Sequence, residues 1–331
     1  MIKEDLVDIY DSTELLWDEV REKKLFLSGA TGFFGIWLIK SFIYANDKLN
    51  LNSQASILTR NPNIFEKQFP SISSNPSIKL HEGDIRDFEF LDDDFSHIIH
   101  GATTSATETY NKQDPLTKLD TVVNGTRNTL NFAVHCGCKK FLLLSSGSVY
   151  GKQPENLNNL EEKYMGAPYT TDKNFDSSVL GESKRLSELL TTIYSEKFNI
   201  NTKVARCFSF VGPYLPLNIH YAIGNFIRDA INGKTINVSG DGSPIRSYMY
   251  ITDLITWVWT ILFKSKDCEI YNIGSEREIS IENLAILISN STEKKVDVDI
   301  NKARKINTQI DRYIPSTKKA QKELNLEQKV D

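Results

Sequence analysis

Three regularly spaced glycines carry the clearest chemical signal in the sequence. Gly29, Gly32 and Gly35 stand between the apolar run LFLS and the helical pattern IWLIKSFIY. In such a strand–turn–helix unit the first glycine permits a tight turn, the second lets a ligand approach the backbone, and the third lets the helix pack on the strand. The spacing predicts a turn that binds the pyrophosphate of a dinucleotide. The other residues expected at this turn are Thr31, Phe33 and Phe34.

The end of the second expected strand bears on the form of the dinucleotide. NAD-preferring proteins place an acidic residue there, against the ribose hydroxyls, whereas NADP-preferring proteins often place an arginine. Here the strand ends Leu58-Thr59-Arg60, without an acid. Arg60 either pairs with a 2′-phosphate or stacks on the adenine. We therefore expect NAD or NADP, with NADP compatible and Arg60 among the contacts.

The elements that position these residues alternate between short strands and helices from Lys24 onward. Runs such as LFL, HIIH and FLLLS are apolar at consecutive positions, as is typical of strands covered on both faces. The pattern predicts an α/β protein with a Rossmann doubly wound parallel sheet and a smaller C-terminal substrate lobe. We expect a helical extension over 1–23, the dinucleotide-binding domain over 24–210, and the lobe over 211–331, with interleaved segments.

Two further stretches have a distinct character. A polar segment between Gly151 and Leu180 lacks periodicity and predicts a long loop beside the site, of the kind that often forms a lid. The run ITWVWTILF at 255–263 is too short to span a bilayer and predicts a buried helix.

Composition excludes several classes of partner. A net charge of −4 and a pI near 5.8 argue against nucleic acid as a partner. The N-terminal residues lack the apolar core of a secretory signal, and no run reaches about eighteen apolar residues, so we expect a cytoplasmic protein without membrane partners. The four cysteines are expected to be free and largely buried, and their C-x-C pair lacks the second cluster of a zinc site.

The G-x-x-G-x-x-G spacing resembles that of the extended short-chain dehydrogenase/reductases, the NAD-dependent nucleotide-sugar epimerase and dehydratase family, and the resemblance covers nearly the whole chain. Gly83-Asp84-Ile85-Arg86-Asp87 is similar to the segment in which an aspartate, here Asp84, binds the adenine amino group. Asn124-Gly125-Thr126 resembles the N-x-x-G-T helix that braces the sheet. The further cofactor contacts that the resemblance implies are Ile85, Ala102, Thr103, Asn124, Ser145 and Lys184.

The resemblance also implies a nucleotide-sugar substrate. Gly240-Asp241-Gly242 followed by Arg246 is similar to the family's turn whose arginine meets the diphosphate. Arg312, in DRYIPST, is either a second such cation or a surface side chain. Arginine suits this role because its planar fork bonds two phosphate oxygens and stays charged. Ser146 and Asn225 are expected to contact the substrate as well.

A homodimer is implied by the same resemblance. It would be built from the helix near 117–136 and the helix that carries Lys184, packed as a four-helix bundle across a two-fold axis. The apolar residues Leu186, Leu189, Leu190 and Ile193 form either a core face or this interface.

The family's acid–base pattern is incomplete here. Ser146 matches the family serine before the V-Y-G strand end, and Lys184 matches the lysine of Y-G-x-S-K-x-x-x-E, but the tyrosine position is Leu180. In the family, the phenolate removes the sugar hydroxyl proton as hydride leaves. Leucine cannot exchange a proton. Tyr164 and Tyr169 in the polar loop are the candidates to replace it, and Tyr169 opens a Y-x-x-x-K match with Lys173.

The residues after Ser146 bear on the reaction. The family's 4,6-dehydratases carry Asp-Glu where this chain has Gly147-Ser148, and its UDP-glucuronate decarboxylases carry a glutamate where Ser148 stands. Neither residue here can act as acid or base. The resemblance therefore implies an epimerase or oxidoreductase acting at C4. The alternatives are a dehydratase or decarboxylase, and a binding protein that has lost its acid–base residue.

Overall fold

A seven-stranded parallel sheet forms the centre of the computed structural model, which describes residues 2–104, 108, 111, 114–171, 176–219, 221–293, 295–303 and 309–330. The strand order is β11-β6-β5-β4-β1-β2-β3, and every neighbouring pair is parallel. The strands are β1 (Lys24–Ser28), β2 (Gln54–Thr59), β3 (Ile78–Glu82), β4 (His97–His100), β5 (Lys140–Ser146), β6 (Asn201–Cys207) and β11 (Glu269–Ile273). The predicted Rossmann fold is confirmed. The order reverses between β1 and β4, and ligands of such sheets bind at the carboxyl ends of the strands there.

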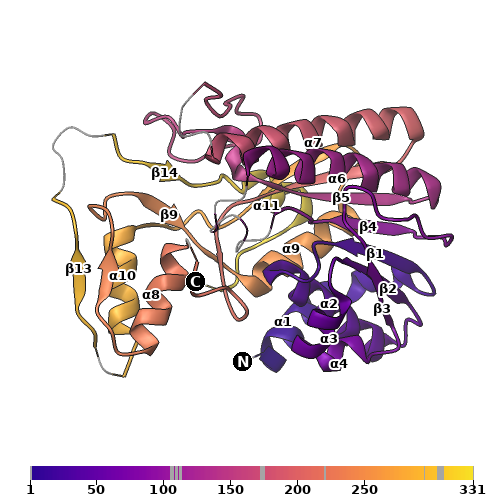
Figure 1. The fold of residues 1–331 in the computed structure, drawn as a ribbon, viewed down its shortest axis with the longest axis horizontal. Helices are drawn as coiled ribbons and strands as arrows, with labels where there is room; N and C mark the ends of the chain where they lie inside the picture. The colour runs from indigo at the N-terminus through magenta and orange to yellow at the C-terminus, as the bar shows by residue number, and fades with distance from the viewer. Residues whose placement is uncertain are drawn as a thin grey trace.

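Helices cover both faces of this sheet, as Figure 1 shows. One face carries α1 (Ile2–Thr13), η1 (Glu14–Val20), α2 (Phe33–Leu49) and α9 (Ile251–Lys264). The other face carries α6 (Pro115–His135) and α7 (Asp176–Phe198). The apolar run at 255–263 lies inside α9 and is buried, as predicted, with Trp259 packed on Trp17 of η1. Two short helices, α3 (Pro62–Gln68) and α4 (Pro70–Ser73), join β2 to β3.

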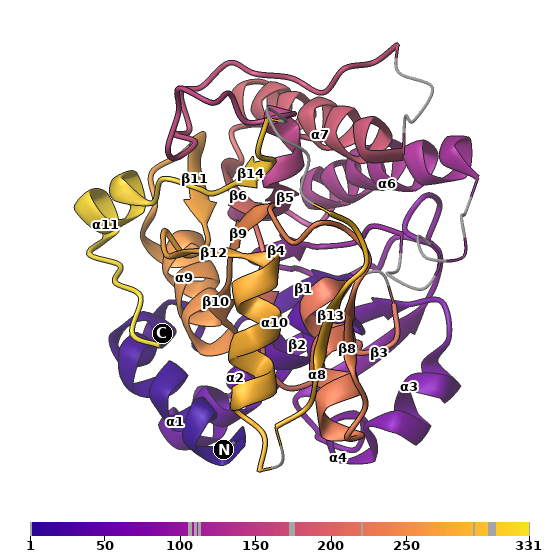
Figure 2. The ribbon, with the colours of Figure 1, turned by 90° about the vertical axis from the view of Figure 1, so that its left-hand side faces the viewer.

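A smaller lobe stands beside the carboxyl ends of the strands (Figures 1 and 2). Its helices α8 (Ala222–Ile231) and α10 (Ile281–Asn290) share an apolar cluster with two small sheets. These sheets are β12-β9-β14 and β13-β8, from β8 (Ile236–Val238), β9 (Ile245–Ser247), β12 (Glu278–Ser280), β13 (Val298–Ile300) and β14 (Arg312–Tyr313). Because α9 and β11 return to the large sheet between β9 and β12, the chain passes between lobe and sheet more than once.

The polar segment after Gly151 is tied to the C-terminal part of the chain. Leu160 forms an isolated bridge with Pro315, its N–H donates to Ile314 at 2.8 Å, and its carbonyl accepts from Ser316 at 2.7 Å. Helix α7 then begins at Asp176, earlier than the expected end of the loop at Leu180. Lys173, the partner of Tyr169 in the Y-x-x-x-K match, lies outside the described residues.

The remaining elements complete the description. They are η2 (Gly147–Tyr150), the pair β7 (Phe210–Val211) and β10 (Met249–Tyr250), and α11 (Lys318–Leu324). Beyond α11 the chain runs back to the N-terminal helix, where Lys329 donates to Ser12 (Figure 2). None of the helices in the described ranges has the length and apolarity needed to cross a membrane. Three cysteines are buried as expected, but Cys268 is exposed.

Candidate active site

The glycine turn at the end of β1 is shaped by two close backbone approaches. Gly29 has φ +70°, and a Cβ there would lie 2.4 Å from the Gly101 carbonyl carbon. A Cβ on Gly35 would lie 2.2 Å from the Cα of Ala30. At Gly32 a Cβ would meet only the Gly29 oxygen, at 3.6 Å, and no side chain caps the helix that starts there. The first backbone N–H groups of α2 are therefore open to an anion, and the turn fits a dinucleotide pyrophosphate.

A cavity of about 410 Å³ adjoins this turn at the ends of β1 and β2. Its wall includes Thr31, Arg60 and Glu108. Arg60 is engaged by Glu108, with Nη1 2.7 Å from Oε1 and Nη2 3.3 Å from Oε2. Arg60, which could pair with a 2′-phosphate or stack on the adenine, therefore already binds a carboxylate of the protein. The remaining lining residues are Thr59, Asn61, Ile64, Phe65 and Gln68.

The aspartate expected at the adenine is held by a neighbouring arginine. Both oxygens of Asp84 accept from Arg86, at 2.8 and 2.9 Å, and this guanidinium lowers the pKa of Asp84. Ile85 lies against α6, where a Cβ on Gly125 would come within 2.9 Å of it. Glycine at that helix position thus allows the loop after β3 to pack closely.

The other residues predicted around the cofactor occupy different settings. Ala102 is buried beside Gly29, whereas Thr103 is exposed. Asn124 is exposed on α6 and donates to Asp120 one turn earlier. Phe33 and Phe34 are partly buried at the start of α2, and Phe34 packs edge-on against Phe210.

Adjacent serines at the end of β5 face opposite ways, as successive strand residues do. Ser145 is buried and donates to Glu188 of α7 at 2.6 Å. Glu188 in turn holds Arg206 of β6 in a buried ion pair. Ser146 is half-buried, and its Oγ accepts from the N–H of Ser148 at 3.1 Å. Ser145 therefore braces the sheet, and Ser146 is the hydroxyl that a ligand can reach.

Lys184 lies beneath this strand end. Its side chain is buried, and Nζ donates to the carbonyl oxygen of Leu144 at 2.8 Å. Burial disfavours the ammonium form and lowers the pKa of Lys184 to about 8. Sequence and structure thus agree in bringing Lys184 to the same strand end as Ser146.

Leu180, which stands at the position of the family tyrosine, and the two candidate loop tyrosines lie in different places. Leu180 is half-buried on α7, one turn before Lys184. The next residue, Gly181, approaches the turn after Ser146 so closely that a Cβ would lie 2.6 Å from the Ser148 oxygen. Tyr164 packs against Tyr150 in a small apolar cluster. Tyr169 is 73% exposed. No described contact brings either loop tyrosine to Ser146.

Tyr313 of β14 reaches this point instead, and the sequence analysis missed it. Its phenol lies beside the residue after Ser146, since a Cβ on Gly147 would come within 2.5 Å of the Tyr313 hydroxyl oxygen. Its ring packs on Phe208, with centroids 4.6 Å apart. The sequence gives little sign of Tyr313. In the segment DRYIPST, only Arg312, the residue before Tyr313, matches an expected role.

His100 at the end of β4 is a second residue that the sequence analysis missed. It is fully buried, with Nδ1 2.7 Å from the Ser28 hydroxyl and Nε2 3.1 Å from the Thr126 hydroxyl. Burial lowers its pKa to about 3, so the ring is neutral. The histidine links β1, β4 and α6 directly behind the glycine turn. Its place at the end of the run HIIH was the available signal.

Two predicted phosphate-binding arginines lie on neighbouring strands of the small lobe. In the parallel pair β14–β9, Arg312 stands opposite Ile245 and Tyr313 opposite Arg246. Arg246 pairs with Asp311, and Arg312 pairs with Glu278. The Nε of Arg312 is buried without a hydrogen-bond partner in the described structure. Asn225 of α8 accepts from Arg228 and lies elsewhere in the lobe, on the helix that packs on β8.

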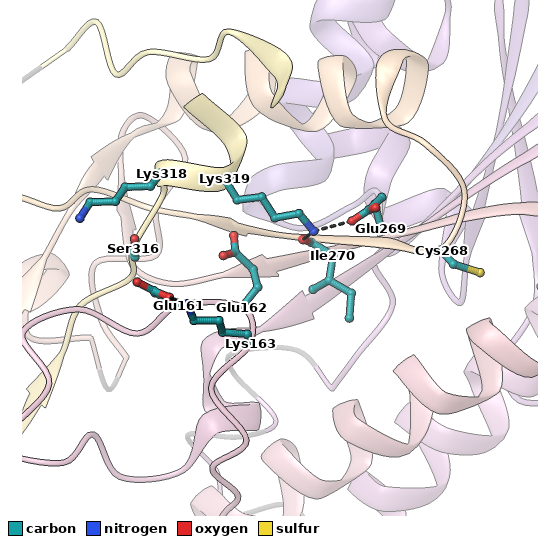
Figure 3. A pocket seen from close by; sticks show the side chains of 9 residues that line it. All are labelled: Glu161, Glu162, Lys163, Cys268, Glu269, Ile270, Ser316, Lys318 and Lys319. Atoms are coloured by element: carbon teal, nitrogen blue, oxygen red, sulfur yellow. Dashed lines mark hydrogen bonds and ion pairs between the residues drawn. The ribbon is translucent and has the colours of Figure 1, made fainter. Parts of the chain in front are cut away.

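A larger cavity, about 510 Å³, lies at the far edge of the sheet, beside β11 and α11 (Figure 3). Two ion pairs lie in its wall, Lys319 with Glu269 and Lys163 with Glu161. It contains none of the residues predicted from the sequence, and the candidate site remains the group around Gly32, Ser146 and Lys184.

Comparison with known proteins agrees with this arrangement. UDP-glucuronic acid decarboxylase 1 of Arabidopsis thaliana is 27% identical over 309 residues, covering 93% of this chain and 66% of that protein. Its counterpart in Xenopus tropicalis is 28% identical, covering 82% of this chain and 60% of that protein. The chain thus spans less than two thirds of the length of these curated relatives.

Solved structures share the fold. A UDP-glucuronic acid 4-epimerase from Bacillus cereus superposes with a TM-score of 0.77 at 21% identity, covering 93% of this chain and 95% of that chain. A dTDP-glucose 4,6-dehydratase from Streptomyces venezuelae gives a TM-score of 0.75 at 22% identity, covering 93% and 92%. The family model for the NAD dependent epimerase/dehydratase family matches residues 25–274. The chain belongs to the NAD dependent epimerase/dehydratase family.

Proposed function

We propose that this protein binds NAD and catalyses hydride transfer at C4 of a nucleotide sugar, as an epimerase or oxidoreductase. One observation carries the proposal. At the end of β5 the reachable Ser146 hydroxyl is followed by Gly147 and Ser148, and the buried Lys184 lies beneath it. This arrangement can orient a sugar hydroxyl, but positions 147 and 148 supply no carboxylate that could eliminate water.

NAD, when bound, accepts hydride from the sugar and can return it. The open N-terminus of α2 at Gly32 supports pyrophosphate binding at that end of the site. The pairing of Arg60 with Glu108 favours NAD over NADP, because a 2′-phosphate would have to displace or approach that carboxylate. Of the two forms that the sequence leaves open, NAD is therefore the one that we propose.

One arginine of the small lobe supports a diphosphate-linked substrate. Arg246 stands opposite Tyr313 in the β14–β9 pair, so the two side chains share one face of this small sheet, whereas the neighbouring Arg312 lies on the other face. A diphosphate would have to take the place of Asp311 on the guanidinium of Arg246. A nucleotide sugar held in this way at Arg246 would extend its sugar toward Tyr313 and Ser146.

Decarboxylation is the second candidate, because the curated relatives named above are UDP-glucuronic acid decarboxylases. Oxidation at C4 of a sugar acid yields a β-keto acid, which can lose CO₂ without a positioned carboxylate pair. Both candidates therefore share the first step at Ser146. Dehydration across C5 and C6 needs acid and base side by side and is disfavoured by Gly147 and Ser148.

Product mass distinguishes the candidates. The purified protein is incubated with NAD and, separately, UDP-glucose, UDP-glucuronic acid and dTDP-glucose, and the nucleotide sugars are analysed by liquid chromatography and mass spectrometry. We expect a product of unchanged mass and altered retention, or a reduced or oxidised product at C4. Loss of CO₂ would support the second candidate instead, and loss of water would contradict both. Binding of a nucleotide sugar without any product would indicate a binding protein.

A further inference from the structure

We propose that Tyr313 is a catalytic residue of this site, and that its hydroxyl contacts the reacting oxygen of the sugar where Leu180 leaves no polar group. The inference rests on the proposed function. It replaces the two loop tyrosines, Tyr164 and Tyr169, with a residue from the small lobe. Four features of the structure support it: the place of the phenol beside Ser146, a glycine that makes room, a fixed strand register and partial exposure.

The position of the phenol puts it at the reacting end of the sheet. Its hydroxyl lies beside Gly147, the residue after Ser146, and the Ser146 hydroxyl acts to lower the pKa of Tyr313. Ser146 is the reachable hydroxyl at the end of β5. Tyr313 and Ser146 are both half-buried, so a ligand can touch them. Two neighbouring hydroxyls can hold one substrate oxygen, because each can donate a hydrogen bond to it.

Gly147 creates the space that the phenol occupies. A Cβ at this position would lie 2.5 Å from the Tyr313 hydroxyl oxygen and 2.8 Å from the ring of Phe208. Both distances are too short for a real side chain, so any residue other than glycine would displace the phenol. Tyr313 can therefore lie beside Ser146 only because position 147 has no side chain.

Strand pairing fixes the position of the tyrosine. Tyr313 stands opposite Arg246 in the β14–β9 pair, and the next N–H along the chain, that of Ile314, donates to Gln153 at 3.0 Å. The charged and titratable groups that act on Tyr313 come from three other elements: Tyr150 of η2, Cys207 of β6 and Arg246 of β9. The phenol is thus held between the sheet and the small lobe.

The protonation state decides the role of the phenol. Burial raises the pKa of Tyr313 above its usual value, so the hydroxyl keeps its proton at neutral pH. In the reducing direction, Tyr313 would give its proton to the oxygen of a keto sugar, while reduced NAD would supply the hydride for the carbonyl carbon. The O–H bond of Tyr313 breaks, and the phenolate regains a proton from water. The reverse oxidation needs the phenolate and should increase with pH.

The test compares Tyr313→Phe with Tyr271→Phe. Tyr271 is the control because its phenol also has a side-chain partner, Glu323, but it lies on β11 at the sheet edge. We expect Tyr313→Phe to keep its bound dinucleotide and its thermal stability, since the ring still packs on Phe208. Its turnover of the sugar nucleotide should fall by roughly 10²- to 10⁴-fold, the usual contribution of a positioned acid–base group. Tyr271→Phe should retain turnover.

A second readout needs no substrate. The ultraviolet difference titration of the wild type against Tyr313→Phe isolates the ionisation of this phenol. We expect the pKa of this phenol well above the ordinary value near 10, and higher still in Ser146→Ala, because the Ser146 hydroxyl acts to lower it. A phenol that titrates at the ordinary value and does not respond to Ser146→Ala would overturn the inference.

The outcomes separate this inference from the proposed function. An active wild type with an equally active Tyr313→Phe would overturn the role of Tyr313 and leave the proposed function intact. A wild type that acts on no sugar nucleotide would overturn the proposed function and this inference with it.

Discussion

Leucine at position 180 leaves the helix face that carries Lys184 without the hydroxyl that the family tyrosine would supply there. The two residues are one turn apart on α7, so their side chains share a side of the helix. Among the described residues, Lys184 donates its hydrogen bond to a backbone carbonyl, that of Leu144. The polar groups of the reacting end therefore come from β5 and from the small lobe.

Placing a tyrosine at position 180 tests whether the small lobe supplies the phenol of the site. With Tyr313 in place, Leu180→Tyr should raise turnover little, because the site already has a phenol. In the Tyr313→Phe background, where turnover is low because the acid–base group is missing, Leu180→Tyr should raise turnover at least about tenfold. Leu180→Phe is the matched control, with the same ring and no hydroxyl. A large gain from Leu180→Tyr in the wild-type background would show that Tyr313 does not fill the role.

His100 makes stability depend on pH. Its ring is enclosed by Ser28, Thr126 and Thr129, and the nearby Lys184 ammonium further opposes a positive charge on it. The pKa of His100 is lowered from 6.5 to about 3, so the unfolded state binds a proton that the folded state excludes. Stability is therefore lost as pH falls below 6.5, and the loss continues until about pH 3.

Denaturant unfolding at several pH values measures this effect. Between pH 6 and pH 4, the wild type should lose up to about 1.4 kcal/mol per pH unit more than His100→Gln does. His135→Gln, at an exposed histidine on α6, should follow the wild type. Parallel pH dependence of the wild type and His100→Gln would contradict the interpretation of His100 as a buried neutral ring.

How far the site could be predicted differs from residue to residue. Ser146 and Lys184 were predicted because they lie in local motifs, at a strand end and on the following helix. Tyr313 could not be predicted, since it lies in a two-residue strand near the end of the chain and reaches Ser146 only through pairing with β9. The partners of Arg60 and Asp84 were also missed, because a sequence pattern does not show which side chain holds another.

At the scale of elements, the glycine turn combines structural and binding requirements. Gly29 and Gly35 are needed for backbone approach within the protein. Gly32 has room for a side chain on the protein's side, so its glycine is explained by the ligand that the turn faces.

Two substitutions separate these requirements. Gly32→Val should leave thermal stability close to that of the wild type and abolish retained dinucleotide, because its side chain would point toward the pyrophosphate. Gly35→Ala should destabilise the fold by roughly 1–3 kcal/mol or more, as overpacking typically does. The measurements are thermal unfolding and mass spectrometry of nucleotides released on denaturation. A folded Gly32→Val protein with full dinucleotide occupancy would refute the binding role of the turn.

Elements with a strong local pattern were predicted, and those that depend on distant partners were not. The consecutive apolar residues of β1, β4 and β5 and the apolar run of α9 are visible in sequence because both faces of each are buried. The short strands β12 and β14 have no such pattern, and they form only by flanking β9. The polar loop was predicted, but its attachment to residues 314–316 was not.

At the scale of the molecule, the two faces of the sheet are covered differently. The face with α2 and α9 has a second cover, because α1 and η1 pack on those helices. Within the described part of the chain, no second layer covers the face with α6 and α7, and both helices display large apolar side chains. On α7 these are Leu186, Leu189 and Ile193, and on α6 they are Leu116 and Leu119. Leu190, by contrast, packs into the core beneath.

This uncovered face is where we expect two copies of the chain to associate. Leu189 is 54% exposed and Ile193 is 47% exposed, and their spacing puts both on one side of α7. Exposed apolar groups at this spacing are typical of a helix that packs on another helix. A four-helix bundle from two copies would cover them.

Sedimentation tests this interface. The wild type should sediment as a dimer at micromolar concentration. The double variant Leu189→Glu/Ile193→Glu should sediment as a folded monomer, because a dimer would bury its charges without partners. Ile231→Glu is the control, since Ile231 is 71% exposed on α8, away from this face. A wild type that sediments only as a monomer would contradict the expected interface, and so would a double variant that remains dimeric.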